Sequence, residues 1–328
     1  MKKKKMLTRI LSCLLTMSFV TVMTSCGDKD DKQKQIRIIG KSQQSSIYWD
    51  VVNAGASAAG EELGYNVEYI APESEKDIDG QISLINKAVQ DKVDGIVIAP
   101  INADDMNEAM QSAKDSGISI LTIDSKSSLD DMVYIGTDNY VAGTIAGTEA
   151  AKMLNESKKV AIVALNEEST LSVRWKGFED SVASDSSINI VEKTYCNSDK
   201  ETAKKQTAEL IDKYPDIEMI CGVNQTTTLA ICETIVEKGV QGKIKVVGYD
   251  AAEPEVEYIN QGVLTGTVVQ NPYNIGYLGV KNVADMADGK SISKIIDTGT
   301  TFVTADNIND EAIQLLIYPM GNNGGTVK

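Results

Sequence analysis

Histidine is missing from all 328 residues of the chain. This absence excludes a Ser-His-Asp triad, a Cys-His dyad and a zinc ion held by imidazole, because each of these sites needs an imidazole ring. Carboxylate, lysine or thiol catalysis remains open in principle. The absence of histidine makes an enzyme less expected but does not exclude one.

Basic residues are scarce, with 32 Lys and Arg against 47 Asp and Glu and a formal net charge of -15. Such a surface repels the phosphates of nucleic acids, and the sequence has no basic stripe with interleaved aromatic residues to override that repulsion. We therefore expect no nucleic-acid partner.

An apolar stretch near the N-terminus is too short to cross a membrane comfortably as a helix. Residues 10–23 are mainly apolar but diluted by Ser and Thr, and a spanning helix needs about 20 apolar residues. Lys2 to Lys5 and Arg9 precede this stretch. A charged segment followed by a short apolar one is typical of a signal peptide; the alternative is a retained membrane anchor.

The segment after the apolar stretch is similar to a bacterial lipoprotein signal. Met23-Thr24-Ser25-Cys26 places a small residue before a cysteine, although the usual leucine is Met23 here. The resemblance implies a signal peptide over residues 1–25 and a lipidated Cys26. The polar residues 27–35 have nothing to bury and complete a flexible tether over 26–35. We expect an exported chain, lipid-anchored on the outer face of the cytoplasmic membrane or in the periplasm; the alternative is that Cys26 only neighbours an ordinary cleavage site.

Cysteine is also rare, since only Cys196, Cys221 and Cys232 follow Cys26. An odd number argues against a disulfide framework, and lone thiols in apolar segments usually act as small core residues. A single Cys221–Cys232 bridge remains an alternative.

Short apolar runs alternate with segments of helical periodicity from residue 36 onward. The expected strands are 36–40, 67–71, 95–99, 118–124, 133–136, 160–165, 188–194, 218–223, 244–248 and 264–270, with a short one near 300–304. Near-continuous Val and Ile in several of them indicate strands buried on both faces of a parallel sheet. Helices are expected over 49–63, 78–89, 272–288 and 310–316, and capping boxes at Ser74–Asp77 and Ser198–Glu201.

The ten longer strands fall into two series of five, which predicts an α/β protein with two Rossmann-like lobes and parallel sheets. The first lobe is expected over 36–137 plus 271–299 and the second over 138–270 plus 300–328. The chain would cross between them three times, forming a hinge. Ligands of such sheets sit at the carboxyl ends of the strands. A dinucleotide is not expected there, because no G-x-G-x-x-G follows the first strand.

The segments at these strand ends resemble the bacterial sugar-binding proteins of the ribose-binding type, which are substrate-binding lipoproteins of ABC transporters. The resemblance runs from about residue 36 to the last helix. It is carried by WDVVNAGA at 49–56, DGIVIAP at 94–100, TIDS at 122–125, GTDN at 136–139 and VGYD at 247–250. It implies the type I periplasmic binding protein fold.

The resemblance also implies which residues bind the ligand. They are two aromatics for the sugar ring, two carboxylates, a hydroxyl, an arginine and two amides: Tyr48, Trp49, Asp124, Asp250, Ser125, Arg174, Asn224 and Gln270. An aromatic face suits the C–H groups of a sugar, while charged and amide groups suit its hydroxyls. Family members that bind ribose have an arginine at the position of Ser125, which puts ribose itself in doubt. As alternatives, the aromatics staple a helix to the core and the two aspartates cap helices.

From this resemblance we expect a monomeric extracytoplasmic protein that captures a monosaccharide or related small polyol. We expect it not to be an enzyme and to have no catalytic residue, no bound metal and no cofactor. Its partners would be that sugar, the permease of an ABC-type importer, and the membrane through the lipid anchor. One alternative is a ligand-sensing receptor subunit for a signalling or chemotaxis partner. Another is an enzyme that uses Asp124 or Asp250 as acid or base.

Overall fold

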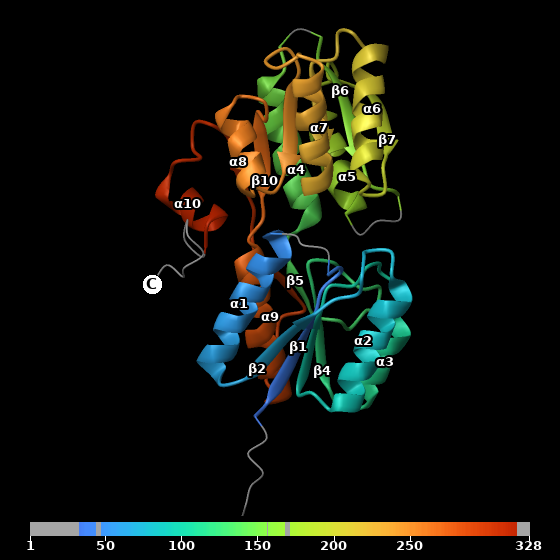
Figure 1. The fold of residues 1–328 in the computed structure, drawn as a ribbon, viewed down its shortest axis with the longest axis vertical. Coiled ribbons are helices and arrows are strands. Elements are labelled where there is room, and N and C mark those ends of the chain that lie inside the picture. The colour runs from blue at the N-terminus through green and yellow to red at the C-terminus, as the bar shows by residue number, and fades with distance from the viewer. Residues whose placement is uncertain (1–32, 44–46, 156, 168–170, 320–328) are drawn as a thin grey trace, which may run out of the picture. The chain divides into compact units, whose positions relative to one another are not determined.

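Two sheets, each with helices on both faces, form two α/β lobes in the computed structural model (Figure 1). The structure describes residues 33–43, 47–155, 157–167 and 171–319, all within one unit from Gln33 onward. The expected signal peptide, Cys26 and most of the tether lie outside the described residues.

The sheet of the first lobe has the strand order β11-β5-β4-β3-β1-β2, and all its strand pairs are parallel. Its strands are β1 (Gln35–Ile39), β2 (Asn66–Ile70), β3 (Gly95–Ile98), β4 (Ser119–Ile123), β5 (Tyr134–Gly136) and β11 (Ile295–Asp297). Its helices are α1 (Ile47–Leu63) and α9 (Pro272–Ala287) in one core, and α2 (Ile78–Asp91) and α3 (Asn107–Asp115) in the other. The central strands β3 and β4 are nearly all apolar because both their faces are covered.

The sheet of the second lobe has the order β12-β10-β9-β8-β6-β7. Its strands are β6 (Lys159–Ala164), β7 (Asn189–Tyr195), β8 (Met219–Gly222), β9 (Lys245–Tyr249), β10 (Gly266–Val269) and β12 (Thr301–Val303). One core contains α4 (Asn139–Met153) and α5 (Ser172–Val182); the other contains α6 (Lys200–Lys213), α7 (Gln225–Glu237), α8 (Glu253–Asn260) and α10 (Glu311–Ile317).

All ten strands predicted in the two series are present, but two features of the sheets differ from the prediction. The edge strand β12 runs antiparallel to β10, so the second sheet is not wholly parallel. It follows β11, an edge strand of the other sheet, after three residues. The second difference is β11 itself, a short and partly exposed strand that the sequence did not predict.

The chain passes between the two sheets at three places. It leaves β5 for α4 near Asp138, leaves β10 for α9 near Gln270, and leaves β11 for β12 near Thr300. These connections bring strand ends from both lobes to one region of the molecule.

Two helix starts differ from the expected capping boxes. The N-cap of α2 is Asp77 rather than Ser74, and its carboxylate accepts from the backbone N–H of Gly80 at 2.9 Å. The N-cap of α6 is Asp199, one residue after Ser198, and it accepts from Thr202 N–H. In both cases a carboxylate satisfies the orphan donors of the first turn.

The three cysteines beyond Cys26 are buried and free. Cys221 lies in the core with α4 and α5, and Cys232 lies in the core on the opposite face of the sheet. Cys221 and Cys232 therefore do not form the disulfide that was considered as an alternative. Across the described ranges, none of the helices has the length and apolar character required to cross a bilayer.

Candidate functional site

A pocket of about 140 Å³ lies at the carboxyl ends of strands from both sheets. It is lined by Lys41, Tyr48, Trp49, Glu75, Ile101, Asp124, Leu165, Leu171, Arg174, Asn224, Gln225, Thr226, Asp250 and Gln270. Charged and amide side chains make up more than half of this lining. The parallel strands of each lobe deliver these side chains to one edge, as the fold requires.

Seven of the eight side chains expected to bind the ligand line this pocket, and Ser125 lies just outside the lining. Ser125 is 1% exposed. Its hydroxyl donates to Asp124 at 2.9 Å and accepts from Lys41 at 2.5 Å. The structure therefore places Ser125 beneath the pocket, holding two residues that line it.

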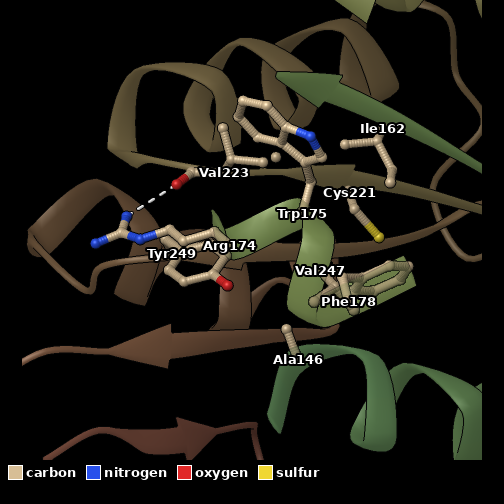
Figure 2. A pocket seen from close by; sticks show the side chains of 10 residues that line it. Ala146, Ile162, Arg174, Trp175, Phe178, Cys221, Val223, Val247 and Tyr249 are labelled. Atoms are coloured by element: carbon tan, nitrogen blue, oxygen red, sulfur yellow. Dashed lines mark hydrogen bonds between the residues drawn. The ribbon is translucent and has the colours of Figure 1, made fainter. Parts of the chain in front are cut away.

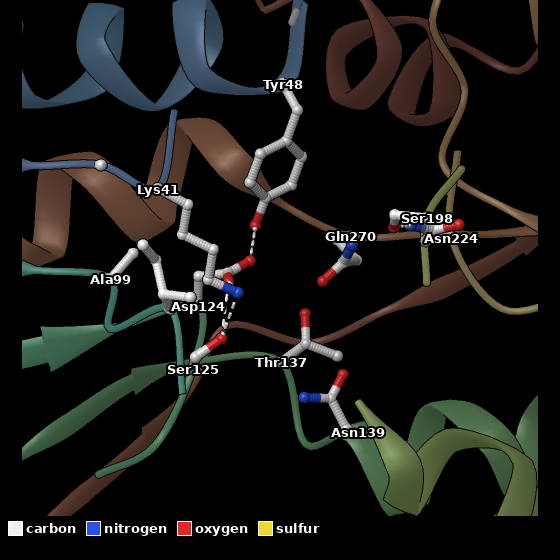
Figure 3. A network of polar contacts seen from close by, with 12 residues as sticks. Lys41, Tyr48, Ala99, Asp124, Ser125, Thr137, Asn139, Ser198, Asn224 and Gln270 are labelled. Carbon is white, nitrogen blue, oxygen red and sulfur yellow. Dashed lines mark hydrogen bonds and ion pairs between the residues drawn. The ribbon is translucent and has the colours of Figure 1, made fainter. Parts of the chain in front are cut away.

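A charge pair forms the wall of the first lobe (Figure 3). The ammonium of Lys41 lies 2.8 Å from Oδ2 of Asp124, and the hydroxyl of Tyr48 donates to Oδ1 of Asp124 at 2.8 Å. Burial works to raise the pKa of the Asp124 carboxyl. The charge of Lys41 and the hydrogen bonds to this carboxylate outweigh burial, so the pKa lies below its ordinary value and the group stays ionised.

The two neighbouring aromatics at the start of α1 have different surroundings. Trp49 is 7% exposed and packs in the core of the first lobe. The rings of Tyr48 and Trp49 meet edge to face, with centroids 5.2 Å apart. This contact fixes the Tyr48 ring, so the staple alternative and the ligand hypothesis are compatible.

Arg174 is the buried cation of the second lobe, 2% exposed. Its Nε donates to Asn139, its Nη1 to the carbonyl of Val223 at 2.9 Å and its Nη2 to Gln270 at 2.8 Å. The guanidinium carbon lies 4.5 Å from the ring centre of Tyr249 (Figure 2). Five N–H groups in a rigid fork thus have three protein acceptors, which leaves donors for a ligand in the pocket.

Asp250 follows β9 as Asp124 follows β4, and both have left-handed backbone conformations, with φ of 71° and 60°. Non-glycine residues rarely adopt this conformation outside turns and functional sites. Gln270 donates to Oδ1 of Asp250 at 2.7 Å. Burial raises the pKa of Asp250 in spite of the nearby charge of Arg174. The cap alternative fails for Asp250, because the N-cap of α8 is Ala252.

Asn224 caps the start of α7 and also lines the pocket. As the N-cap of α7 it accepts from Thr227 N–H at 3.0 Å, and its Nδ2 donates to Ser198 at 2.9 Å. The second Nδ2 hydrogen is available to a ligand.

Sequence reasoning missed two residues that the structure brings into the site. Lys41 lies two residues after the end of β1, so its position after a strand was the signal that could have identified it. Asn139 opens α4 and orients Arg174 through a bond of 2.8 Å. The sequence feature that could have identified Asn139 is the GTDN segment at 136–139, which carries part of the family resemblance.

The pocket offers a dense set of directional polar groups. Lys41 and Arg174 supply charged donors, Asp124 and Asp250 supply acceptors, and Gln270 links the two sets. Neighbouring hydroxyls on a small ring can each donate to a carboxylate and accept from a cation. Among the described residues, no group of three or more His, Cys, Asp or Glu side chains could hold a metal ion.

The model of the periplasmic binding protein domain family matches residues 36–291. The D-allose-binding periplasmic protein of Escherichia coli is 25% identical over 276 residues, which cover 80% of this chain and 88% of that protein. The ribose import binding protein of Bacillus subtilis is 24% identical over 300 residues, covering 88% of this chain and 96% of that protein.

Solved structures have a similar fold. An ABC transporter solute binding protein from Agrobacterium vitis with bound D-fucose has a TM-score of 0.81 and 29% identity, and the match covers 87% of this chain and 100% of that one. A carbohydrate transporter solute binding protein from Agrobacterium radiobacter in complex with D-arabinose has a TM-score of 0.82 and 30% identity, covering 88% and 99%.

Proposed function

Because the chain belongs to the periplasmic binding protein domain family, we propose that it captures a monosaccharide or related small polyol and delivers it to an ABC-type importer. The observation that carries this proposal is the pocket itself, in which an ionised Asp124–Lys41 pair faces Arg174, Asp250 and Gln270. Buried charges demand complete hydrogen bonding, and a polyhydroxylated ring supplies many short-range partners. The sugars in the related solved structures support the same ligand class.

The pocket draws on both lobes, which supports a closing mechanism. We assign 36–137 with 271–299 to one lobe and 138–270 with 300–328 to the other. Asp124 belongs to the first and Arg174 to the second, so a ligand that touches both binds the closed form more tightly and shifts the population toward it. The closed form then presents the surface that a permease recognises. The protein acts as a monomer and performs no chemistry on the sugar.

The N-terminal sequence supports anchoring on the outer face of the cytoplasmic membrane or in the periplasm. In this proposal residues 1–25 are removed and Cys26 carries the lipid. Mass spectrometry of the N-terminal peptide tests this directly. Cys26→Ala is expected to move the protein from the membrane fraction to the soluble fraction, and an unchanged distribution contradicts the anchor.

Thermal unfolding against a panel of monosaccharides, polyols and nucleosides tests the ligand class. A ligand that binds only the folded state raises the unfolding midpoint once it exceeds its Kd. We expect a shift with at least one sugar, lost in Arg174→Ala. The matched control is Lys176→Ala on the same helix, whose exposed side chain pairs with Asp180. A shift with a nucleoside alone would overturn the sugar class, and an unchanged sugar shift in Arg174→Ala would overturn the site.

A further inference from the structure

A second cavity adjoins the polar pocket, and its chemistry is different. It has a volume of about 50 Å³. Its apolar lining comes from α1, the start of α8, the start of α9 and the end of α10, with Ile47, Val51, Ala252, Pro272, Leu316 and Ile317. We call this cavity the annex.

The annex shares part of its wall with the polar pocket. Tyr48, Gln225, Asp250 and Gln270 line both cavities. The amide of Gln270 is occupied, since it donates to Asp250 and accepts from Arg174. The two cavities therefore lie next to each other, on either side of these side chains.

A hydroxyl group in the annex would find few side-chain hydrogen-bond partners. Beyond the shared wall its side chains are aliphatic or proline, so a hydroxyl placed there would lose its bonds to water without replacement. Ile47 is also 48% exposed, which leaves apolar surface that a bound group could cover. The cavity therefore favours an apolar group over a second sugar.

From the shared wall and the apolar lining we propose that the physiological ligand is a sugar with an apolar substituent, and that the substituent passes the shared side chains and occupies the annex. This inference rests on the proposed function. A water molecule needs roughly 10–15 Å³ of cavity volume, so the annex of about 50 Å³ has room for roughly three to five atoms of that size. An alkyl glycoside with a short chain fits this description, whereas a free monosaccharide leaves the annex without an apolar occupant.

Isothermal titration of the purified protein with matched ligands tests the proposal. The probes are D-ribose, D-glucose, D-galactose and D-fucose, each with its α- and β-methyl and α- and β-n-propyl glycosides. Burying a methylene raises affinity about fourfold. For a sugar that binds, we expect one n-propyl anomer to bind about tenfold more tightly than the corresponding methyl glycoside, and the other anomer to show no such gain.

Filling the annex supplies the second measurement. Ala252 caps α8 without a side-chain hydrogen bond, so Ala252→Leu adds bulk to the annex without removing a cap. We expect it to abolish the n-propyl preference, measured as the ratio of the two glycoside affinities. Val236→Leu, at an exposed position near the end of α7, is the control and should preserve that ratio.

The outcomes separate the two proposals. Binding of a free sugar with no n-propyl gain in either anomer overturns the annex proposal and leaves the proposed function standing. A gain that persists in Ala252→Leu also overturns it, because the chain then lies elsewhere. Failure of every sugar and glycoside to bind overturns the proposed function and the annex proposal together.

Discussion

The Lys41 ammonium and the Asp124 carboxylate form an ion pair of 2.8 Å in which each side chain is about nine-tenths buried, with 9% and 10% exposed. A buried pair of this kind contributes little net stability, but removing one partner leaves an uncompensated charge and costs about 3–5 kcal/mol. The pair therefore makes the site sensitive to single substitutions.

The first prediction concerns this pair. Lys41→Met should lower the free energy of unfolding by about 3 kcal/mol or more, because Asp124 remains buried without its cation. Lys41→Met with Asp124→Asn should recover much of the loss, since Asn tolerates the left-handed backbone at φ 60°. Urea denaturation measures both. Equal destabilisation of the single and double variants would show that the charges are not coupled.

The second prediction concerns the backbone that positions Arg174. A Cβ added at Gly143 would lie 1.9 Å from the carbonyl oxygen of Arg174, so Gly143→Ala must push α5 away from α4. We expect a loss of about 1–3 kcal/mol in stability and a weakening of sugar binding beyond tenfold. Gly60→Ala, which meets Val67 in the first lobe, is the control that destabilises without moving Arg174. Equal sugar affinities in Gly143→Ala and Gly60→Ala would contradict the link between the α4–α5 contact and the position of Arg174.

The third prediction is a pH dependence of stability. Glu255 is fully buried, and its Oε1 has no hydrogen-bond partner among the described residues. Burial, reinforced by the charge of Asp250, raises the pKa of Glu255 from 4.5 to about 8. The folded chain thus holds this proton more tightly than the unfolded chain, so stability falls as pH rises from about 4.5 to about 8.

Chemical denaturation at several pH values measures this effect. The raised pKa of Glu255 corresponds to at most about 5 kcal/mol in the free energy of unfolding. Glu255→Gln should remove this part of the dependence of stability on pH. Glu257→Gln, exposed on the same helix, should retain it. Parallel pH profiles for the wild type and Glu255→Gln would contradict the assignment.

The fourth prediction concerns Tyr249, whose ring lies against Arg174. Its hydroxyl is buried, with no hydrogen-bond partner in the described parts of the chain. Tyr249→Phe should therefore preserve the ring contact and raise stability by about 1 kcal/mol. Tyr134→Phe is the contrast, because the Tyr134 hydroxyl donates to the carbonyl of Thr137 at 2.7 Å and its loss should destabilise. A destabilised Tyr249→Phe would indicate that a water molecule satisfies this hydroxyl in solution.

The fold was largely predictable because its central strands are buried on both faces and appear in the sequence as apolar runs. Ile96 to Ile98 and Val160 to Val163 are nearly inaccessible to solvent, and such runs identify themselves in a sequence. β11 was not predicted because Ile295 is 57% exposed and the strand has only three residues. The partly exposed strands β2 and β7 were nevertheless predicted, and both are longer than β11.

The site was predictable in its residue types but not in its pairing. The family resemblance supplied Asp124 and Arg174, whereas the partner of Asp124 comes from a residue 83 positions earlier in the chain. Only the side-by-side order of β1, β3 and β4 brings Lys41 to that carboxylate. Ser125 was expected to bind the ligand through its hydroxyl, but that hydroxyl bonds to Lys41 and Asp124 instead. The direction of this side chain depends on the local backbone conformation, which the sequence pattern does not specify.

The edge strands β11 and β12 come from the last tenth of the chain, yet each completes a different sheet. A ribosome must therefore synthesise almost the whole polypeptide before either lobe can close its native sheet. Folding cannot finish domain by domain from the N-terminus, as it generally does in multidomain proteins. This order of synthesis delays the final fold until most of the polypeptide is available.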